Sequence, residues 1–163
     1  MRLWLLLIPI WCLAGINVEE YTYKMRGSHP LYISDEFVIK ISRGTKKDNQ
    51  EILREGYILQ YLNRVECTCC PKLLEMGISD RGRAYLVIEY IPSASGLTRQ
   101  CVIDSYIEQK NLGVYQGDPC RSNMRFHNGR CILIDYGMAQ IHPKFIHQSN
   151  EEFIKLFSEK IPK

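Results

Sequence analysis

One acidic side chain falls where the helical pattern calls for an apolar one. Residues 48–63 have helical periodicity, and Glu55 lies in the middle of the apolar stripe of that helix, formed by Ile52, Ile58, Leu59 and Leu62. A buried carboxylate is unfavourable unless a cation neutralises it. Lys40 is the candidate partner, because it lies mid-strand in the alternating segment 36–41, opposite three large apolar residues. The alternative is a Glu at the edge of the stripe that reaches solvent.

Two further carboxylates and an amide have types suited to metal binding and proton transfer. Asp135 follows the apolar run 132–134 and precedes Gly137, and a carboxylate at the end of a buried strand is well placed to bind a metal ion. Asp118 and Asn123 stand five residues apart in an irregular segment. Each of these three residues, taken alone, is also typical of a turn. Their order along the chain, after the Lys and the Glu, favours a joint site.

Taken in that order, the motifs resemble those of the protein kinase-like superfamily. Val38-Ile39-Lys40 resembles the strand motif whose Lys binds nucleotide phosphates, and residues 54–60 resemble the helix that carries its Glu partner. Residues 86–92 resemble the last strand and the hinge, with Ile88 as the gatekeeper. The resemblance covers about residues 36–140.

The later motifs are similar to the catalytic elements of that superfamily. Gly117-Asp118 through Asn123 resembles the shorter catalytic loop of small-molecule and atypical kinases. Asp135-Tyr136-Gly137 resembles Asp-Phe-Gly, with Tyr in place of Phe. Gln116-Gly117 stands where His-Arg is usual, and Gly27-Ser28 is all that remains of a glycine-rich loop before Lys40.

The resemblance implies a nucleotide site with ATP and Mg2+ as cofactors. Lys40 would bind the α- and β-phosphates and be oriented by Glu55, and the backbone near Glu89 and Ile91 would hydrogen-bond the adenine.

The resemblance also implies the groups that would carry the transfer. Asn123 and Asp135 would bind Mg2+, and Asp118 would act as the catalytic base that orients the acceptor hydroxyl and takes its proton.

The expected fold is an α+β, minimal protein kinase-like fold. It comprises a small antiparallel sheet lobe with one main helix (about residues 17–91), a hinge (about 89–97) and a reduced helical C-terminal lobe (about 98–163). The segment 17–30 is expected to be irregular. The remaining elements are strands over 73–78 and 84–90, a helix over 98–112, a loop over 115–123, a hairpin of 124–127 with 130–134, and a last helix from a Ser149–Glu152 capping box to about residue 160.

The first 15 residues predict a signal peptide, with Arg2 before an apolar run and small residues at Ala14 and Gly15. A buried N-terminal strand or helix is the alternative. Cleavage would leave residues 16–163, secreted or in the lumen of the secretory pathway, with six cysteines, an even number that suggests disulfides. Cys120 and Cys131 are the first pair to test.

A run of closely spaced cysteines, Cys67-Thr68-Cys69-Cys70, lacks the C-x-x-C spacing of a zinc knuckle, so a metal ion is not expected there.

Composition excludes several classes of protein. The net charge of +3, without a basic block, gives no case for nucleic-acid binding. With 45% hydrophobic and 24% charged residues the chain is expected to be globular, and no stretch after residue 16 is apolar enough for a stable membrane span.

These observations favour an ATP-dependent phosphotransferase, namely a secreted minimal Ser/Thr protein kinase. The alternatives are a pseudokinase that serves as a binding module and a small-molecule kinase; the presence of all five polar residues argues against the pseudokinase. The small size of the chain, with only 26 residues after Gly137, is similar to that of the compact effector kinases of bacterial pathogens and of Bud/RIO-like kinases. One effector type phosphorylates a host heat-shock chaperone, so the expected partner is a protein substrate, a chaperone being one example.

Overall fold

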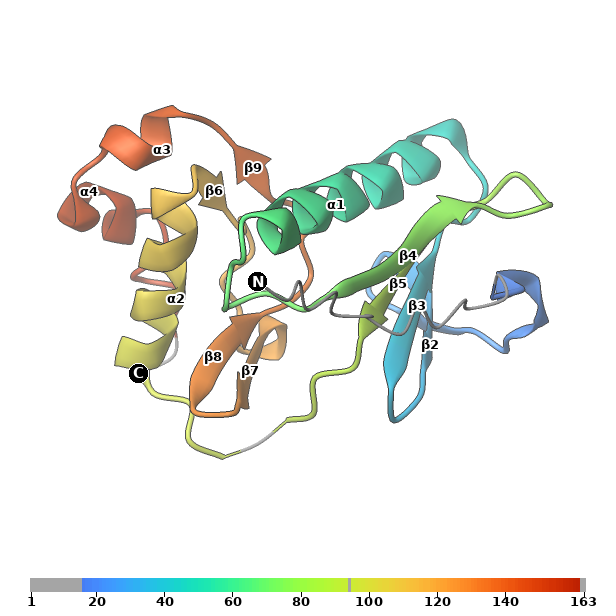
Figure 1. Cartoon of the computed structure of the whole chain (residues 1–163), viewed down its shortest axis with the longest axis horizontal. Helices are drawn as coiled ribbons and strands as arrows, with labels where there is room; N and C mark the ends of the chain where they lie inside the picture. Colours follow the sequence, from blue (N-terminus) through green and yellow to red (C-terminus); the bar gives the residue numbers. More distant parts are fainter. Residues whose placement is uncertain (1–15, 94, 162–163) are drawn as a thin grey trace, which may run out of the picture.

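The computed structural model describes residues 16–93 and 95–161, and it has two parts joined by an extended linker (Figure 1). The first part is a five-stranded antiparallel sheet with one long helix on one face. The second part contains the remaining helices and two small two-stranded sheets. This is the α+β arrangement, a small sheet lobe with one main helix followed by a reduced helical lobe, that the sequence predicts.

The sheet has the strand order β1-β2-β3-β5-β4, and every neighbouring pair is antiparallel. Its strands are β1 (Lys24–Arg26), β2 (His29–Ile33), β3 (Phe37–Ile41), β4 (Leu73–Ile78) and β5 (Ala84–Glu89). Strand alternation sets which side chain faces which layer. Ile39 and Ile41 pack with Val87 against the N-terminal segment that carries the short 3-10 helix η1 (Val18–Glu20), whereas Lys40 faces the opposite side.

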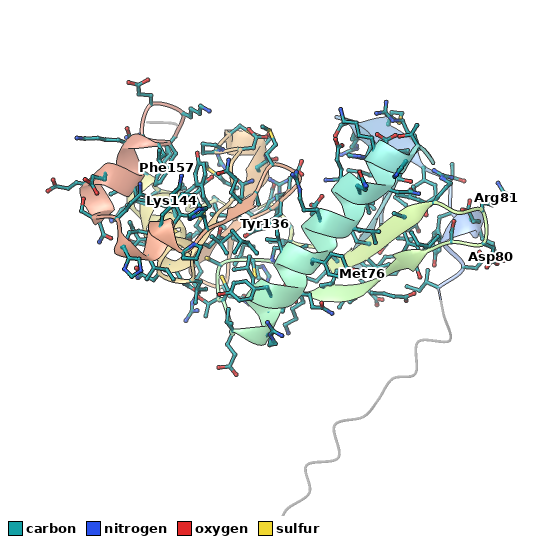
Figure 2. The ribbon with its side chains drawn as sticks, turned by 90° about the horizontal axis from the view of Figure 1, so that it is seen from above. Met76, Asp80, Arg81, Tyr136, Lys144 and Phe157 are labelled. Atoms are coloured by element: carbon teal, nitrogen blue, oxygen red, sulfur yellow. The ribbon has the colours of Figure 1, made fainter. Side chains whose placement is uncertain are left out.

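The long helix α1 (Lys46–Arg64) covers that opposite side of the sheet. Its first turn is capped by Thr45, whose side chain accepts a hydrogen bond from the Asp48 N–H. Ile52 in its buried face packs on Leu86 of β5. Figure 2 shows α1 lying over the strand that carries Met76, and the turn with Asp80 and Arg81 at the far tip of the sheet. The carboxylate of Glu55 therefore points toward the layer that contains Lys40.

The C-terminal part is organised around α2 (Arg99–Asn111), which begins at the N-cap Thr98 and ends at Leu112. The other elements of this part are β6 (Val114–Tyr115), the 3-10 helix η2 (Arg121–Asn123), β7 (Met124–His127), β8 (Arg130–Leu133), β9 (Gln140–Ile141), α3 (Lys144–His147) and α4 (Asn150–Lys155). The strands pair as β6 with β9 and as β7 with β8, both antiparallel.

A cluster of aromatic side chains joins these helices. Tyr106 of α2 stacks on Phe157 at 4.2 Å between ring centroids, and Phe153 and Phe145 pack edge-on around Tyr115. Aromatic pairs in these geometries stabilise beyond the area that they bury. The same core includes Ile58, Leu59 and Leu62 of α1, so one hydrophobic core continues from the sheet lobe into the helical lobe.

Most predicted elements are confirmed with small shifts of their ends. The helices predicted over 48–63 and 98–112 are α1 and α2, and the hairpin turn at Asn128-Gly129 has both residues at positive φ (50° and 77°), as its sequence requires.

Three predictions of local structure were wrong. Residues 17–30 are not irregular, because they contain η1, β1 and the start of β2. Tyr115 does not begin a loop: it is the second residue of β6, which pairs with the distant strand β9. The last helix keeps the predicted Ser149–Glu152 capping box but ends at Lys155, followed by turns.

The predicted signal peptide, residues 1–15, lies outside the described residues. Within residues 16–93 and 95–161, none of the helices combines the length and the apolar character needed to cross a lipid bilayer.

Candidate functional site

One pocket of about 450 Å³ between the two parts is lined by all seven residues that the sequence predicts for the nucleotide, metal and catalytic sites. These residues are Lys40, Glu55, Glu89, Ile91, Asp118, Asn123 and Asp135. They come from the sheet, α1, the linker, the loop after β6 and the end of β8, so only the folded chain brings them together. A concave, largely preformed pocket with a few convergent polar groups is the usual form of a small-ligand site.

Lys40 lies at the centre of the polar groups in this pocket. Its Nζ donates to Glu55 Oε2 at 2.7 Å and to Asp135 Oδ1 at 2.9 Å. The other oxygen of Glu55 accepts the Tyr136 N–H at 3.0 Å, so the carboxylate also holds the residue after Asp135. The ion pair that the sequence predicts between Lys40 and Glu55 is confirmed, and Glu55 (2% exposed) does not reach solvent.

The charges of this group depend on one another. Burial by itself would lower the pKa of Lys40, but the carboxylates of Glu55 and Asp135 outweigh burial and raise that pKa above its ordinary value. Burial would raise the pKa of Asp135, but the adjacent Lys40 ammonium outweighs it and lowers that pKa. Lys40 is therefore charged at all physiological pH values, as a group that binds phosphate must be. Asp135 is ionised, as a carboxylate that binds a metal ion must be.

The buried side chain of Gln116 ties the two loops of the site together. Its Nε2 donates to the carbonyl oxygens of Ile134 (2.9 Å) and Asp135 (2.7 Å). Its Oε1 accepts from Tyr106 Oη (2.8 Å) and from the Asp118 N–H (2.9 Å). In the sequence, Gln116 was of note only because Gln116-Gly117 stands where His-Arg is usual. In the structure it is a positioning residue for both Asp118 and Asp135. No periodicity could have indicated this role.

Gly117 is required by a close approach of two backbones. It has φ +90°, and a Cβ placed there would lie 2.3 Å from the carbonyl oxygen of Met138. Only glycine fits such a conformation without displacing the neighbouring chain. Asp135 itself has φ +61°, a left-handed conformation that Asp tolerates better than most residues. Residues held in such conformations concentrate at functional sites.

Asp118 and Asn123 form a pair on the rim of the pocket. Asn123 Nδ2 donates to Asp118 Oδ2 at 2.8 Å and to the Asp118 carbonyl oxygen at 3.2 Å. The carbonyl of Asn123 accepts the Ile134 N–H, which places the amide beside the strand end that leads to Asp135. Among the described residues these contacts leave Asn123 Oδ1 and Asp135 Oδ2 without a hydrogen bond, and oxygen donors of this kind suit Mg2+.

The linker residues offer backbone groups to the pocket. Glu89 donates its N–H to the Lys72 carbonyl oxygen at 3.0 Å, so only its carbonyl can serve as a ligand group. In the described part of the chain the Ile91 N–H takes part in no hydrogen bond, and Ile91 lines the pocket. One acceptor and one donor thus lie two residues apart, which suits the edge of a planar heterocycle.

The turn between β1 and β2 forms one wall of the pocket; the sequence indicated its Gly27-Ser28 as the remnant of a glycine-rich loop but gave no role to Arg26. Arg26, Gly27 and Ser28 line the pocket there, with Gly27 at φ +64°. Arg125, on β7, is another lining residue that sequence reasoning missed. Burial lowers the pKa of Arg125 without neutralising it, so Arg26 and Arg125 add positive charge around the pocket.

The disulfide suggested for Cys120 and Cys131 does not form. All six cysteines of the described residues are free thiols. Cys131 faces the interior beside Cys101 of α2, whereas the Cys120 thiol lies 3.7 Å from Asp118 Oδ2 and 3.0 Å from Ser122 Oγ at the pocket. The two cysteines therefore lie in different surroundings, Cys120 before η2 at the pocket and Cys131 on β8 in the interior.

Comparison with known proteins gives structural matches only. No protein-family model matches this chain, and no curated protein matches it in sequence. The structure of WbdD in complex with the kinase inhibitor LY294002 is similar over 88% of this chain and 46% of that chain, with a TM-score of 0.57 and 14% identity. The structure of vaccinia related kinase 3 is similar over 78% of this chain and 50% of that chain, with a TM-score of 0.50 and 15% identity.

These matches define the class of fold. The chain has a compact protein kinase-like fold, α+β, with a five-stranded antiparallel sheet and one main helix. It spans about half the length of the solved structures that it matches. At this level of identity the likeness establishes the fold alone, and the chemistry has to be argued from the residues in the pocket.

Proposed function

We propose that this protein is an ATP-dependent phosphotransferase that acts on Ser or Thr hydroxyls of a protein substrate. The observation that carries the proposal is the pocket in which Lys40 lies between two carboxylates, 2.7 Å from Glu55 and 2.9 Å from Asp135. Asp118 and Asn123 line the same pocket. Phosphoryl transfer depends on positioning and on charge neutralisation more than on covalent chemistry. This set of groups supplies both.

Each residue has a role that its contacts support. Lys40 binds phosphate oxygens, and Glu55 keeps its ammonium directed into the pocket. Asn123 and Asp135 would hold Mg2+, which would neutralise the charge of the phosphates. The acceptor O–H lies against the carboxylate of Asp118, which takes the proton as the acceptor oxygen forms its bond to the γ-phosphorus and the bond from phosphorus to the ADP oxygen breaks.

The test is transfer of phosphate from Mg-ATP to acceptor proteins, followed by mass spectrometry. Asp118→Ala should reduce transfer by about 10²–10⁴-fold. Nucleotide binding should change far less, because Asn123 keeps its hydrogen bond to the Asp118 carbonyl oxygen when it loses the one to the carboxylate. Asp135→Ala should weaken Mg2+-dependent nucleotide binding as well. Full transfer activity in Asp118→Ala would refute the assignment of the base.

A second candidate is a nucleotide-binding module without transfer activity. The turn Gly27-Ser28 favours it, because so short a turn offers few backbone N–H groups to hold phosphates in place. Under this second proposal the unmodified protein binds Mg-ATP but transfers phosphate neither to protein, nor to small molecules, nor to water.

We also propose that the chain is exported, with cleavage near residue 15. The charged, apolar and small-residue order of residues 1–15 supports this proposal. Sequencing of the mature N-terminus tests it: export with Met1 retained would refute cleavage.

A further inference from the structure

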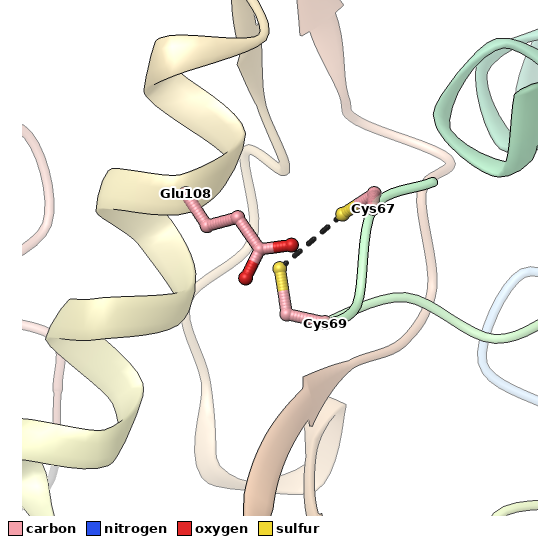
Figure 3. A group of neighbouring side chains, drawn as sticks. All are labelled: Cys67, Cys69 and Glu108. Carbon is pink, nitrogen blue, oxygen red and sulfur yellow. Dashed lines mark hydrogen bonds between the residues drawn. The ribbon is translucent and has the colours of Figure 1, made fainter. Parts of the chain in front are cut away.

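A second cluster of reactive side chains lies away from the pocket, where the chain leaves α1. Cys67 Sγ and Cys69 Sγ are 3.4 Å apart in the loop between α1 and β4. Glu108 reaches them from α2, forty residues later in the chain, as Figure 3 shows. One ligand atom from each residue lies within 4.8 Å of the other two. The proposed phosphotransferase chemistry makes no use of this cluster.

The separations suit a tetrahedral metal ion. Zn2+ is bound at about 2.3 Å by thiolate and about 2.0–2.2 Å by carboxylate, so two thiolates on one ion lie about 3.7 Å apart. The two sulfur atoms need to move by only a few tenths of an ångström from their present separation to reach that value. Thiolate ligands select thiophilic cations over Mg2+ and Ca2+.

Outer contacts hold the carboxylate in place. Glu108 Oε1 accepts the Thr68 N–H at 2.5 Å, and Oε2 accepts the Thr68 hydroxyl at 2.8 Å. Second-layer contacts of this kind orient metal ligands and are part of the binding site. The carboxylate is thus fixed to the residue that stands between the two cysteines.

The sulfur atoms also receive amide donors. Gln109 Nε2 lies 3.6 Å from Cys69 Sγ, and Asn63 Nδ2 lies 3.4 Å from the neighbouring Cys70 Sγ. Gln109 is fully buried, and its Oε1 has no hydrogen-bond partner among the described residues. The Gln109 amide can donate to a thiolate of Cys69, which is the form that binds metal. The Cys69 thiol itself donates to the Ser105 carbonyl oxygen at 3.3 Å, and metal binding would replace that contact.

A divalent ion would balance the charge of the cluster. Two thiolates, one carboxylate and one divalent ion sum to a net charge of only −1.

We propose that Cys67, Cys69 and Glu108 bind one Zn2+ ion, with water in the fourth position. The ion would link the loop that follows α1 to α2. That loop already contacts the strand that leads to Asp135, because the Leu133 N–H donates to the Cys69 carbonyl oxygen at 2.9 Å. The site is thus a structural clamp between the two parts of the fold.

The test is a metal titration of the purified, reduced full chain with Zn2+ against a chromophoric chelator, and with Co2+ as a spectroscopic probe. We expect one ion per chain, a sulfur-to-cobalt charge-transfer band, and thermal unfolding raised by about 5–10 °C when Zn2+ exceeds its Kd 100-fold. Cys67→Ser, Cys69→Ser and Glu108→Gln should each weaken binding by more than about 10–100-fold. Cys101→Ser, in the same helix as Glu108 but outside the cluster, is the matched control and should bind as the unmodified chain does.

Several results would overturn the proposal. They are a Kd weaker than about 10 µM, binding by Cys67→Ser equal to that of the Cys101→Ser control, or a cobalt complex without the sulfur band. A mass two hydrogens below that of the reduced chain, mapped to a Cys67–Cys69 disulfide in native protein, would replace the metal site by a redox pair. Glu108→Gln preserves shape at a partly exposed position, so it gives a folded variant if the cysteine variants do not fold.

Discussion

Gln116→Glu is the substitution that tests the positioning role of Gln116 most sharply. The side chain keeps its shape and its acceptor atoms, but it loses the two N–H groups that donate to Ile134 and Asp135. At neutral pH the carboxylate oxygen that replaces Nε2 would then face both backbone carbonyl oxygens, in a position where Gln116 is fully buried. The change therefore removes hydrogen bonds and adds a buried charge without changing the volume.

The expected cost follows from the groups left without a donor. An unsatisfied buried acceptor costs about 1–3 kcal/mol. The two carbonyls lie in partly buried surroundings, so we expect the lower part of that range for each and a total of about 2–3 kcal/mol at pH 7. This is a large share of the about 5–15 kcal/mol that stabilises a typical domain.

The loss of folding stability in Gln116→Glu should become smaller as the pH falls. Burial and the facing carbonyls raise the pKa of a Glu at this position in the folded state above its ordinary value of about 4.3. The folded protein then binds more protons than the unfolded chain between these two pKa values, so stability rises as the pH falls through the folded-state pKa. A protonated carboxyl can again donate one hydrogen bond.

The assay is urea unfolding of the unmodified protein and of Gln116→Glu between about pH 5 and pH 8. Gln60→Glu is the matched control, because Gln60 is exposed on α1 and the same change there should alter stability by less than about 0.5 kcal/mol. A Gln116→Glu variant as stable as this control, or one whose deficit does not change with pH, would refute the reasoning.

Three further changes address other contacts of the site. Gly117→Ala should destabilise the fold by more than about 2 kcal/mol, because the new Cβ would lie 2.3 Å from a backbone oxygen. Gly82→Ala is the control: Gly82 has φ +72° but open space around it, so the change should cost about 1 kcal/mol in the same unfolding assay. Glu55→Gln should cost about 3 kcal/mol, the lower end for a broken buried pair, since Asp135 still faces Lys40; a loss below about 1 kcal/mol would contradict the pairing. Asp135→Asn should remove at most about 1 kcal/mol, since its side chain is 49% exposed. Because Lys40 lowers the pKa of Asp135, the difference in unfolding free energy between the unmodified protein and Asp135→Asn should be largest above about pH 4 and should disappear as the pH falls further. A difference that grows in acid would contradict the assigned direction of this pKa shift.

Local patterns in the sequence were sufficient for the elements and for one pair of site residues. Apolar spacing determined α1 and the face of β3 on which Lys40 lies, and the Asn128-Gly129 pair determined the β7–β8 turn, because these signals arise within a few residues. The apolar stripe around Glu55 required a cation, and Lys40 supplies it. The expectation that motifs in kinase order would meet in one pocket could also be stated in advance.

Other features were decided by contacts between distant segments. β6 has only two residues, and its pairing with β9 depends on where the chain returns after Tyr136. Gln116 has an ordinary sequence context, and its role comes from four partners in three different segments. Cys67 and Cys69 lack the spacing of a known metal motif, and Glu108 joins them only because α2 packs beside the end of α1. Period and propensity describe neighbours along the chain, whereas hydrogen-bond partners and ligand sets are determined by how the chain packs in three dimensions.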